Sequence, residues 1–243
     1  DVERSRGLGD VYKRQVMTTQ MQTQGATALL FKGLLRPVLV SAVFFMLLTG
    51  LAYPLVTTGL ANLLFPFQAQ GSLVQRDGRV VGSALIGQAF DRPEYFQGRP
   101  SMTLGSDPLD PSKSVPQPYN AGASGASNLG PTSQKLVDSV AARVSAYRQL
   151  NGLAADMPVP VDAVTASASG LDPHISLANA RLQLNRVARQ RQMAAVDVLM
   201  LLQAHSESRT FGLLGEPRVN VLQLNLALDA QAPLHSSPVA ASE

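Results

Sequence analysis

The feature that most constrains this chain is an uncharged stretch that begins after Arg36 and ends before Arg76. Its first part, from Val38 to Val56, is almost entirely apolar (VLVSAVFFMLLTGLAYPLV). An α-helix rises about 1.5 Å per residue, so a segment of this length crosses the roughly 30 Å hydrocarbon core of a bilayer. The sequence therefore predicts a transmembrane helix over residues 38–58, with a helical extension to about residue 67.

A cleaved signal peptide is the other interpretation of an apolar segment near an N-terminus. Signal peptides have an apolar region of about 7–15 residues, whereas here the apolar character continues to Phe67, which favours a permanent span. Pro54 lacks a backbone N–H and predicts a kink near the outer interface. Gly50 and Gly59 are small enough to let another helix approach, and Tyr53 suits the interfacial depth. These last three residues are candidate partner contacts, with an inert anchor as the alternative.

The distribution of charge predicts the orientation of the span. Lys32 and Arg36 precede it and no basic residue follows before Arg76, and cytoplasmic flanks carry the excess of Lys and Arg. The N-terminus is therefore expected in the cytoplasm, with residues 17–37 as a short cytoplasmic segment. Residues 1–37 hold six Lys/Arg against three Asp/Glu, so fourteen of each remain and the rest of the chain is formally neutral. The basic excess lies beside the membrane, and we expect no nucleic-acid binding.

Residues 1–16 are interpreted as an extension that is not native to the chain. The run DVERSRGLGDVYKRQ has no apolar periodicity, resembles a translated sequencing adaptor, and joins abruptly to a Met-rich start at Met17 and Met21. We therefore leave it out of the fold prediction. With either methionine as the start, the cytoplasmic part is a short polar lead, and no cytoplasmic catalytic domain is expected.

The roughly 160 residues after the span are enough for one compact domain with its own core. Cysteine is absent, which excludes disulfides and thiol chemistry, and tryptophan is absent, which argues against a stacking platform for bases or sugars. We predict an α+β protein, in which one N-terminal transmembrane helix is followed by a single mixed α/β extracytoplasmic domain over residues 72–230. A disordered tail is expected over residues 231–243.

Local signals place the elements of this domain. Asp77-Gly78 between two short alternating runs predicts a hairpin over residues 72–81, with residues 83–86 as a continuation of its second strand. The other predicted elements are a helix with Thr132 or Ser133 as its N-cap, an edge strand over 159–166 interrupted by Pro160, and helices over 176–191 and 194–204. In the helix over 176–191, we expect Arg181, Arg186 and Arg189 to face away from the core.

Two segments allow more than one interpretation. Residues 90–131 are rich in Pro, Gly, Ser and Asn, so we predict a loop that is either partly disordered or a binding surface, and the conformation of its part over 102–131 is left open. Residues 219–229 carry alternating leucines, as a strand would, although Asn220 could cap a short helix. The strand and helix interpretations of this last segment both stand.

Catalysis and metal binding are not favoured. Asp172, His174 and Ser176 lie close in sequence, but no G-x-S-x-G elbow accompanies them, and a turn that leads to a helix cap is the simpler interpretation. His174, His205 and His235 are too scattered for the paired spacing of a metal site. We therefore expect no catalytic residue and no metal ligand.

Polar groups of the domain are candidates for partner contact. Arg99 could hold a carboxylate of a partner or of its own domain. Four loop residues could dock the backbone of another subunit or satisfy their own loop, namely Asn120, Ser124, Ser127 and Asn128. Asp172 and Glu216 could attract cations near a channel mouth, although a formally neutral domain gives little long-range steering.

Seven segments stand out along the chain: GSL at 71–73, GSALIGQ at 82–88, YFQGRPS at 95–101, YNAGASGASNL at 119–129, VPVDAVTASASGLDPHIS at 159–176, RVA at 186–188 and GEPRVNVLQLNLALD at 215–229. In this order, and with the apolar segment before them, they resemble the KdpC family, the C subunit of the bacterial Kdp potassium-transporting ATPase. The resemblance covers about residues 36–229. Residues 104–117 look longer than the family's usual link between the GRPS and YN segments.

The resemblance implies an accessory subunit of a bacterial inner-membrane complex that imports potassium at the expense of ATP. The implied partners are a channel-like potassium-translocating subunit and a P-type ATPase subunit, which handle potassium and ATP, so the chain needs no cofactor of its own. The C subunit is implied to assemble them and to act as a catalytic chaperone that raises ATP affinity. The sequence has no G-x-x-x-x-G-K-[ST] phosphate loop, so ATP contact is implied by the resemblance alone. The alternative is a free-standing, membrane-anchored periplasmic hydrolase or binding protein.

Overall fold

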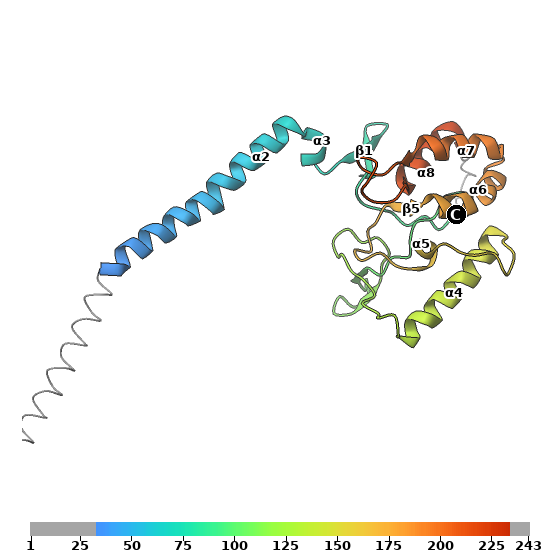
Figure 1. Cartoon of the computed structure of the whole chain (residues 1–243), viewed down its shortest axis with the longest axis horizontal. Helices are drawn as coiled ribbons and strands as arrows, with labels where there is room; N and C mark the ends of the chain where they lie inside the picture. The colour runs from blue at the N-terminus through green and yellow to red at the C-terminus, as the bar shows by residue number, and fades with distance from the viewer. Residues whose placement is uncertain (1–32, 234–243) are drawn as a thin grey trace, which may run out of the picture. The chain divides into compact units, whose positions relative to one another are not determined.

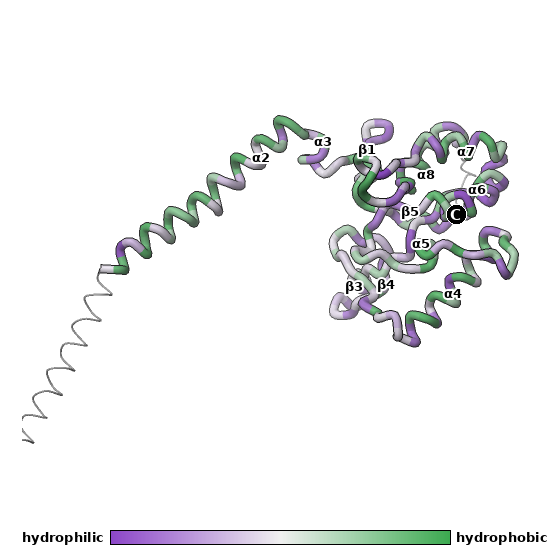
Figure 2. Tube along the Cα trace, in the orientation of Figure 1, coloured by the Kyte–Doolittle hydropathy of each residue, from purple (hydrophilic) through white to green (hydrophobic). Residues whose placement is uncertain are grey.

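The computed structural model describes residues 33–233, which divide into two units at residue 69 (Figure 1). The first unit contains a helix of 32 residues, Gly33–Leu64, that is long and apolar enough to cross a membrane. Figure 2 shows the apolar character along the length of this helix. It begins before the predicted start of the span and ends at Leu64, and a short helix α3 (Pro66–Ala69) follows. The predicted extension at residues 1–16 lies outside the described residues, as does most of the segment 17–37.

A widened helical turn lies at the position where the sequence predicts a kink. The π-helical turn η1 (Leu48–Ala52) precedes helix α2 (Tyr53–Leu64), in which Pro54 stands within the first two positions. A proline ring clashes with the carbonyl four residues earlier and offers no N–H. A π-turn accommodates such a defect inside a helix. The hydroxyl of Thr57 donates to the Tyr53 carbonyl at 2.8 Å, so this polar group is satisfied within the helix, as a lipid environment requires.

The second unit opens with the predicted hairpin. Strands β1 (Leu73–Arg76) and β2 (Arg79–Ser83) pair antiparallel around Asp77 and Gly78, whose φ angles are 52° and 74°. Positive φ at both central positions is the mark of a type I′ turn, which Asp-Gly favours. The hairpin is therefore confirmed, and its second strand ends at Ser83 without continuing to residue 86.

Residues 90–131 are irregular, with one small hairpin inside them. Strands β3 (Leu104–Ser106) and β4 (Ser114–Pro116) pair antiparallel, so the stretch 104–117 that looked long in the sequence folds as a hairpin. The rest of the segment is held by hydrogen bonds to distant loops, as detailed below.

Five helices and a three-stranded antiparallel sheet build the body of the second unit. The helices are α4 (Gln134–Asn151), α5 (Val161–Val164), α6 (Leu177–Arg191), α7 (Ala195–Ala204) and α8 (Val221–Gln231). The sheet has the order β5-β7-β6, formed by β5 (His174–Ser176), β7 (Arg218–Asn220) and β6 (Ser206–Glu207). Helix α7 packs against α6 and α8, and α4 packs against α5 and α6 (Figure 1). The mixed α/β prediction is confirmed.

The apolar core lies between the sheet and helices α6, α7 and α8. Its fully buried members include Phe96, Ile175, Ala180, Val187, Val198, Leu202, Val219, Leu224 and Leu228. Ser133 stands at the N-cap position of α4 but makes no side-chain capping hydrogen bond, whereas Ser176 Oγ accepts from the Asn179 N–H at 3.1 Å at the start of α6. Asn220 Oδ1 likewise accepts from the Gln223 N–H at 3.1 Å, so residues 221–231 are the helix α8 and not a strand.

Two further sequence predictions are wrong. Residues 159–166 do not form an edge strand; Pro160, with φ −58°, stands before the helical turn α5, where its fixed φ is compatible with helix initiation. Arg186 does not face solvent, because it is only 2% exposed and points into the second unit. The predicted tail is partly corrected, since α8 includes Gln231, and residues 234–243, with His235, lie outside the described residues.

Candidate functional site

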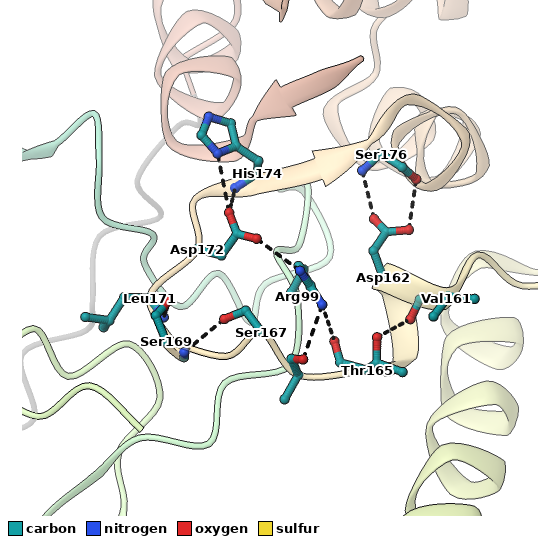
Figure 3. A network of polar contacts seen from close by, with 12 residues as sticks. Arg99, Val161, Asp162, Thr165, Ser167, Ser169, Leu171, Asp172, His174 and Ser176 are labelled. Atoms are coloured by element: carbon teal, nitrogen blue, oxygen red, sulfur yellow. Dashed lines mark hydrogen bonds and ion pairs between the residues drawn. The ribbon is translucent and has the colours of Figure 1, made fainter. Parts of the chain in front are cut away.

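Arg99 connects two loops that are distant in sequence (Figure 3). Its Nη1 donates to Asp172 Oδ2 at 3.1 Å, and its Nη2 donates to the carbonyls of Thr165 and Ala166 at 3.4 and 3.2 Å. The carboxylate that Arg99 holds therefore belongs to its own domain, which was one of the two predicted uses. The contact fixes the GRPS segment against residues 165–172.

Asp172 receives donors on both carboxylate oxygens. Oδ1 accepts from the backbone N–H of His174 at 3.0 Å and lies 3.3 Å from His174 Nδ1, while Oδ2 accepts from Arg99. Burial alone would raise the pKa of Asp172, but the hydrogen bonds from His174 and Arg99 outweigh it and hold this pKa below its usual value. The group is therefore a stable carboxylate and not a proton donor at neutral pH.

Tyr119 packs under the same loop. Its hydroxyl donates to the Arg99 carbonyl at 2.7 Å, and its N–H donates to Ser101 Oγ at 2.9 Å. Burial, together with the negative charge of Asp172, raises the pKa of Tyr119 to about 12. A Cβ on Gly98 would collide with the Tyr119 hydroxyl, and one on Gly87 would lie 2.5 Å from the ring. Only glycine permits this close approach at both positions.

Two of the four loop candidates, Asn120 and Ser124, make hydrogen bonds within their own domain. Asn120 Nδ2 donates to the Leu104 carbonyl at 2.7 Å, and its Oδ1 accepts from the Gly122 N–H at 3.0 Å. Ser124 Oγ donates to the Ser169 carbonyl at 3.0 Å. Ser127 is half-buried, and Asn128 is exposed with φ 51°. Use of these four residues as partner contacts stays a prediction.

The span candidates lie in the other unit. Gly50 is in η1, Tyr53 begins α2 and Gly59 is in its middle. A Cβ on either glycine would meet nothing within 4 Å in the chain, so both positions are open to a partner helix. Their role as contacts also stays a prediction.

The Asp172, His174 and Ser176 group is not assembled as a triad. His174 Nδ1 faces Asp172 at 3.3 Å, and its Nε2 lies 3.9 Å from Glu207 Oε1. Ser176 Oγ instead donates to Asp162 Oδ1 at 2.9 Å and caps α6 (Figure 3). The imidazole thus lies between two carboxylates, while the serine is bonded to a third. A triad needs the base within hydrogen-bond reach of the nucleophile.

The carboxylates suggested for cation attraction are also engaged. Glu216 binds Arg209 through both oxygens at 2.7 Å, and Asp172 binds Arg99. Within residues 33–233, no group of three His, Cys, Asp or Glu side chains is placed to hold a metal ion. The local arrangement is suited to holding loops in place.

Sequence analysis did not anticipate the buried amides that position Arg99. Asn225 exchanges two hydrogen bonds of 2.9 Å with the backbone N–H and carbonyl of Phe96. Gln183 does the same for Gln97, accepting at 2.8 Å and donating at 3.1 Å. Each amide pairs with a backbone N–H and carbonyl, as a neighbouring β-strand would. Residues 96 and 97, which lead to Gly98 and Arg99, are held in place in this way. The signal in the sequence was that Gln183 and Asn225 stand among the core-facing positions of their helices.

Arg186, on the same helix α6 as Gln183, also holds this segment. Its guanidinium donates to the carbonyls of Pro93 and Tyr95, to Asn151 Oδ1 at 2.9 Å and to Gln183 Oε1 at 2.8 Å. Burial lowers the pKa of Arg186. The segment RVA at 186–188 and the segment YFQGRPS at 95–101 are therefore in contact through this side chain.

Comparison with known proteins gives consistent matches. The sequence model of the family described as "KdpC: K+-transporting ATPase, c chain" matches residues 35–230. The potassium-transporting ATPase KdpC subunit of Methylobacterium nodulans is 57% identical over 198 residues, which is 82% of this chain and 97% of that protein. The subunits of the same name from Rhodopseudomonas palustris and Burkholderia mallei are 56% and 54% identical, over 82% and 84% of this chain and 97% and 100% of those proteins.

Proposed function

The chain belongs to the KdpC family, the c chain of the K+-transporting ATPase, and we propose that it is a non-catalytic accessory subunit of such a potassium-transporting complex. Its partners would be the channel-like potassium-translocating subunit and the P-type ATPase subunit. The observation that carries the proposal is the family match, which includes both the apolar helix and the folded unit. A membrane-anchored subunit that acts by binding other subunits would need both the apolar helix and the folded unit.

The internal engagement of the polar groups supports a role without catalysis. Arg99, Asp172 and Ser176 are each bonded within the domain, and His174 lies between two carboxylates. A free-standing anchored hydrolase would need at least one of these groups available to a substrate. The alternative would be favoured if replacing Asp172 or His174 abolished an activity of the full chain in the absence of other subunits, without unfolding it.

The proposed topology puts the folded unit on the periplasmic side of the inner membrane. Lys32 and Arg36 flank the helix on its N-terminal side, which favours a cytoplasmic N-terminus. ATP would then lie on the opposite side from the folded unit. A chaperone effect on ATP affinity, which the family resemblance implies, would have to act through the partner subunits, as a coupling between two states of those subunits.

Co-purification tests the proposed function. The full chain, tagged at its C-terminus and extracted in mild detergent from cells that express all the subunits of the complex, is expected to retain the channel-like and ATPase subunits. Isolation of the tagged chain alone, under conditions in which the two other subunits remain bound to each other, would contradict the proposal.

Single-cysteine labelling tests the topology, because the chain contains no cysteine. Leu109, which is 95% exposed on a loop of the folded unit, is a suitable outer position, and Thr23 lies in the predicted cytoplasmic segment. Leu109→Cys is expected to react with a membrane-impermeant maleimide in intact spheroplasts. Thr23→Cys is the matched control and should react only after the membrane is opened. The reverse pattern would place the folded unit in the cytoplasm.

A further inference from the structure

The loop between β6 and β7 exposes large apolar side chains at its tip. Phe211 is 90% exposed, Leu213 is 81% exposed and Leu214 is 63% exposed. We call residues 208–217 the apolar finger. Single exposed leucines are common on protein surfaces, but three large exposed apolar side chains within four residues are concentrated in one short loop. Their exposure requires an explanation, because the finger belongs to the folded unit and not to the apolar helix that could span a membrane.

The finger is a defined structure and not a loose loop. Thr210 and Leu214 exchange two backbone hydrogen bonds of 2.9 and 3.0 Å, and the Leu213 N–H donates to the Thr210 carbonyl at 3.2 Å. Below the tip, Glu216 binds Arg209 through both carboxylate oxygens at 2.7 Å. The tip is therefore pre-organised, which reduces the entropy lost when it binds a partner.

The residue at the tip is an unfavourable choice for the free chain. Phe211 has φ 54° and Gly212 has φ 73°, as the central pair of a type I′ turn. Asn, Asp or Gly suits the first central position, as Asp77 does in the other hairpin, whereas a bulky aromatic residue there is strained. Phe211 also leaves its ring in water. Neither cost is compensated by contacts of Phe211 within the described residues.

Charge at the base of the finger argues for a protein partner over a lipid surface. Arg209 pairs with Glu216, and Arg218 pairs with Glu207 at 2.8 Å. The four charges cancel, so the finger has no basic excess to attract anionic headgroups, which surface-binding segments usually have. A neutral rim around aromatic and aliphatic anchors is instead typical of the centre of a protein interface.

We propose that the apolar finger inserts its tip, Phe211 and Leu213, into an apolar socket on another subunit of the transporting complex. The inference rests on the proposed function, since it assumes that the chain is assembled with other subunits. The contact would anchor the folded unit independently of the transmembrane helix. Bulk lipid is the competing occupant, because only residues 65–72 separate the end of the apolar helix from β1.

A tryptophan probe distinguishes the socket from lipid, because the chain contains no tryptophan. Phe211→Trp is made in the full chain, which is reconstituted into nanodiscs alone, and also in the complex with the other subunits replaced by tryptophan-free variants. The emission is expected to be that of a solvent-exposed indole in the nanodisc and to shift to the blue on assembly. Leu109→Trp, at an equally exposed position elsewhere, is expected to emit as an exposed indole in both. A blue-shifted Phe211→Trp in the nanodisc without partners, or no shift on assembly, would overturn the proposal.

Phe211→Asn separates binding from folding. Asparagine accepts a positive φ, so the thermal midpoint of the free chain should stay the same or rise. Retention of the other subunits during detergent washing should fall at least tenfold relative to wild type, while Leu109→Ser retains them. Wild-type retention by Phe211→Asn would overturn the proposed contact and leave the accessory function standing. Failure of wild type and Leu109→Ser alike to retain the subunits would instead remove the accessory function.

Discussion

Replacing Arg186 by methionine is expected to lower the free energy of unfolding by about 3–5 kcal/mol, because several buried hydrogen-bond acceptors lose their charged donor. Methionine fills much of the same space but donates no hydrogen bond. Three acceptors would then be left without this donor, namely the carbonyls of Pro93 and Tyr95 and Asn151 Oδ1, while Gln183 Oε1 would keep only the N–H of Gln97. Each unsatisfied buried acceptor costs about 1–3 kcal/mol, partly relieved by local relaxation.

Arg181→Met is the matched control for this change. Arg181 is on the same helix α6 and is exposed, so the same substitution removes the same charge without opening the core. Its effect should lie within about 0.5 kcal/mol, as for most surface substitutions. Urea unfolding of the full chain in mild detergent, followed by circular dichroism, measures both variants. Equal effects of the two substitutions would contradict the role assigned to Arg186.

The wrong orientation predicted for Arg186 has a specific physical origin. Helical periodicity assigns a charged residue to the solvent side, because a charge rarely enters a core without partners. Here the partners are main-chain carbonyls at residues 93 and 95, about ninety positions away in sequence. A periodic pattern contains no information on such long-range acceptors. For the same reason, the hydrogen bonds from the Gln183 and Asn225 side chains to the backbone of Gln97 and Phe96 were not predicted.

Local signals were sufficient where the structure depends on neighbours in sequence. Asp77-Gly78 gives its hairpin, Ser176 and Asn220 cap their helices, and the uncharged stretch after Arg36 gives the long apolar helix. The strand predicted over 159–166 failed because its alternation of apolar residues is short, and Pro160 is equally compatible with the start of a helical turn.

The sequence predicted some of the residues of the candidate site, but not which of them contact one another. Arg99 was expected to hold a carboxylate, but nothing in the sequence identified Asp172 as that carboxylate. The segments YFQGRPS, YNAGASGASNL and VPVDAVTASASGLDPHIS all contribute to one set of contacting loops. Ser101 Oγ donates to the Gly170 carbonyl at 2.7 Å, and the Gly125 N–H donates to the Ser169 carbonyl at 2.9 Å. Loops that meet across such sequence distances are positioned by the core beneath them.

Gly170→Ala should be among the most damaging small substitutions, because it combines a backbone cost with a steric one. Gly170 has φ 69°, and a Cβ there would lie 2.6 Å from Thr103 Cγ2 and 2.7 Å from the Gly125 carbonyl oxygen. Left-handed backbone costs an L-residue about 1–2 kcal/mol, and forcing apart packed groups costs about 1–3 kcal/mol more. We expect a loss of about 3 kcal/mol in the free energy of unfolding.

Gly78→Ala isolates the backbone part of this cost. Gly78 has φ 74° and open space around the position of a Cβ, so its alanine variant should lose only about 1 kcal/mol. Adding Thr103→Ser to Gly170→Ala removes the Cγ2 methyl and keeps the hydroxyl that bonds the Gln117 carbonyl. The double variant should therefore recover part of the loss, because the two sites are in contact and their effects are not additive. Equal losses for Gly170→Ala and Gly78→Ala would mean that the loops meeting at Gly170 separate at little cost, and that their contact does not hold Arg99 in place.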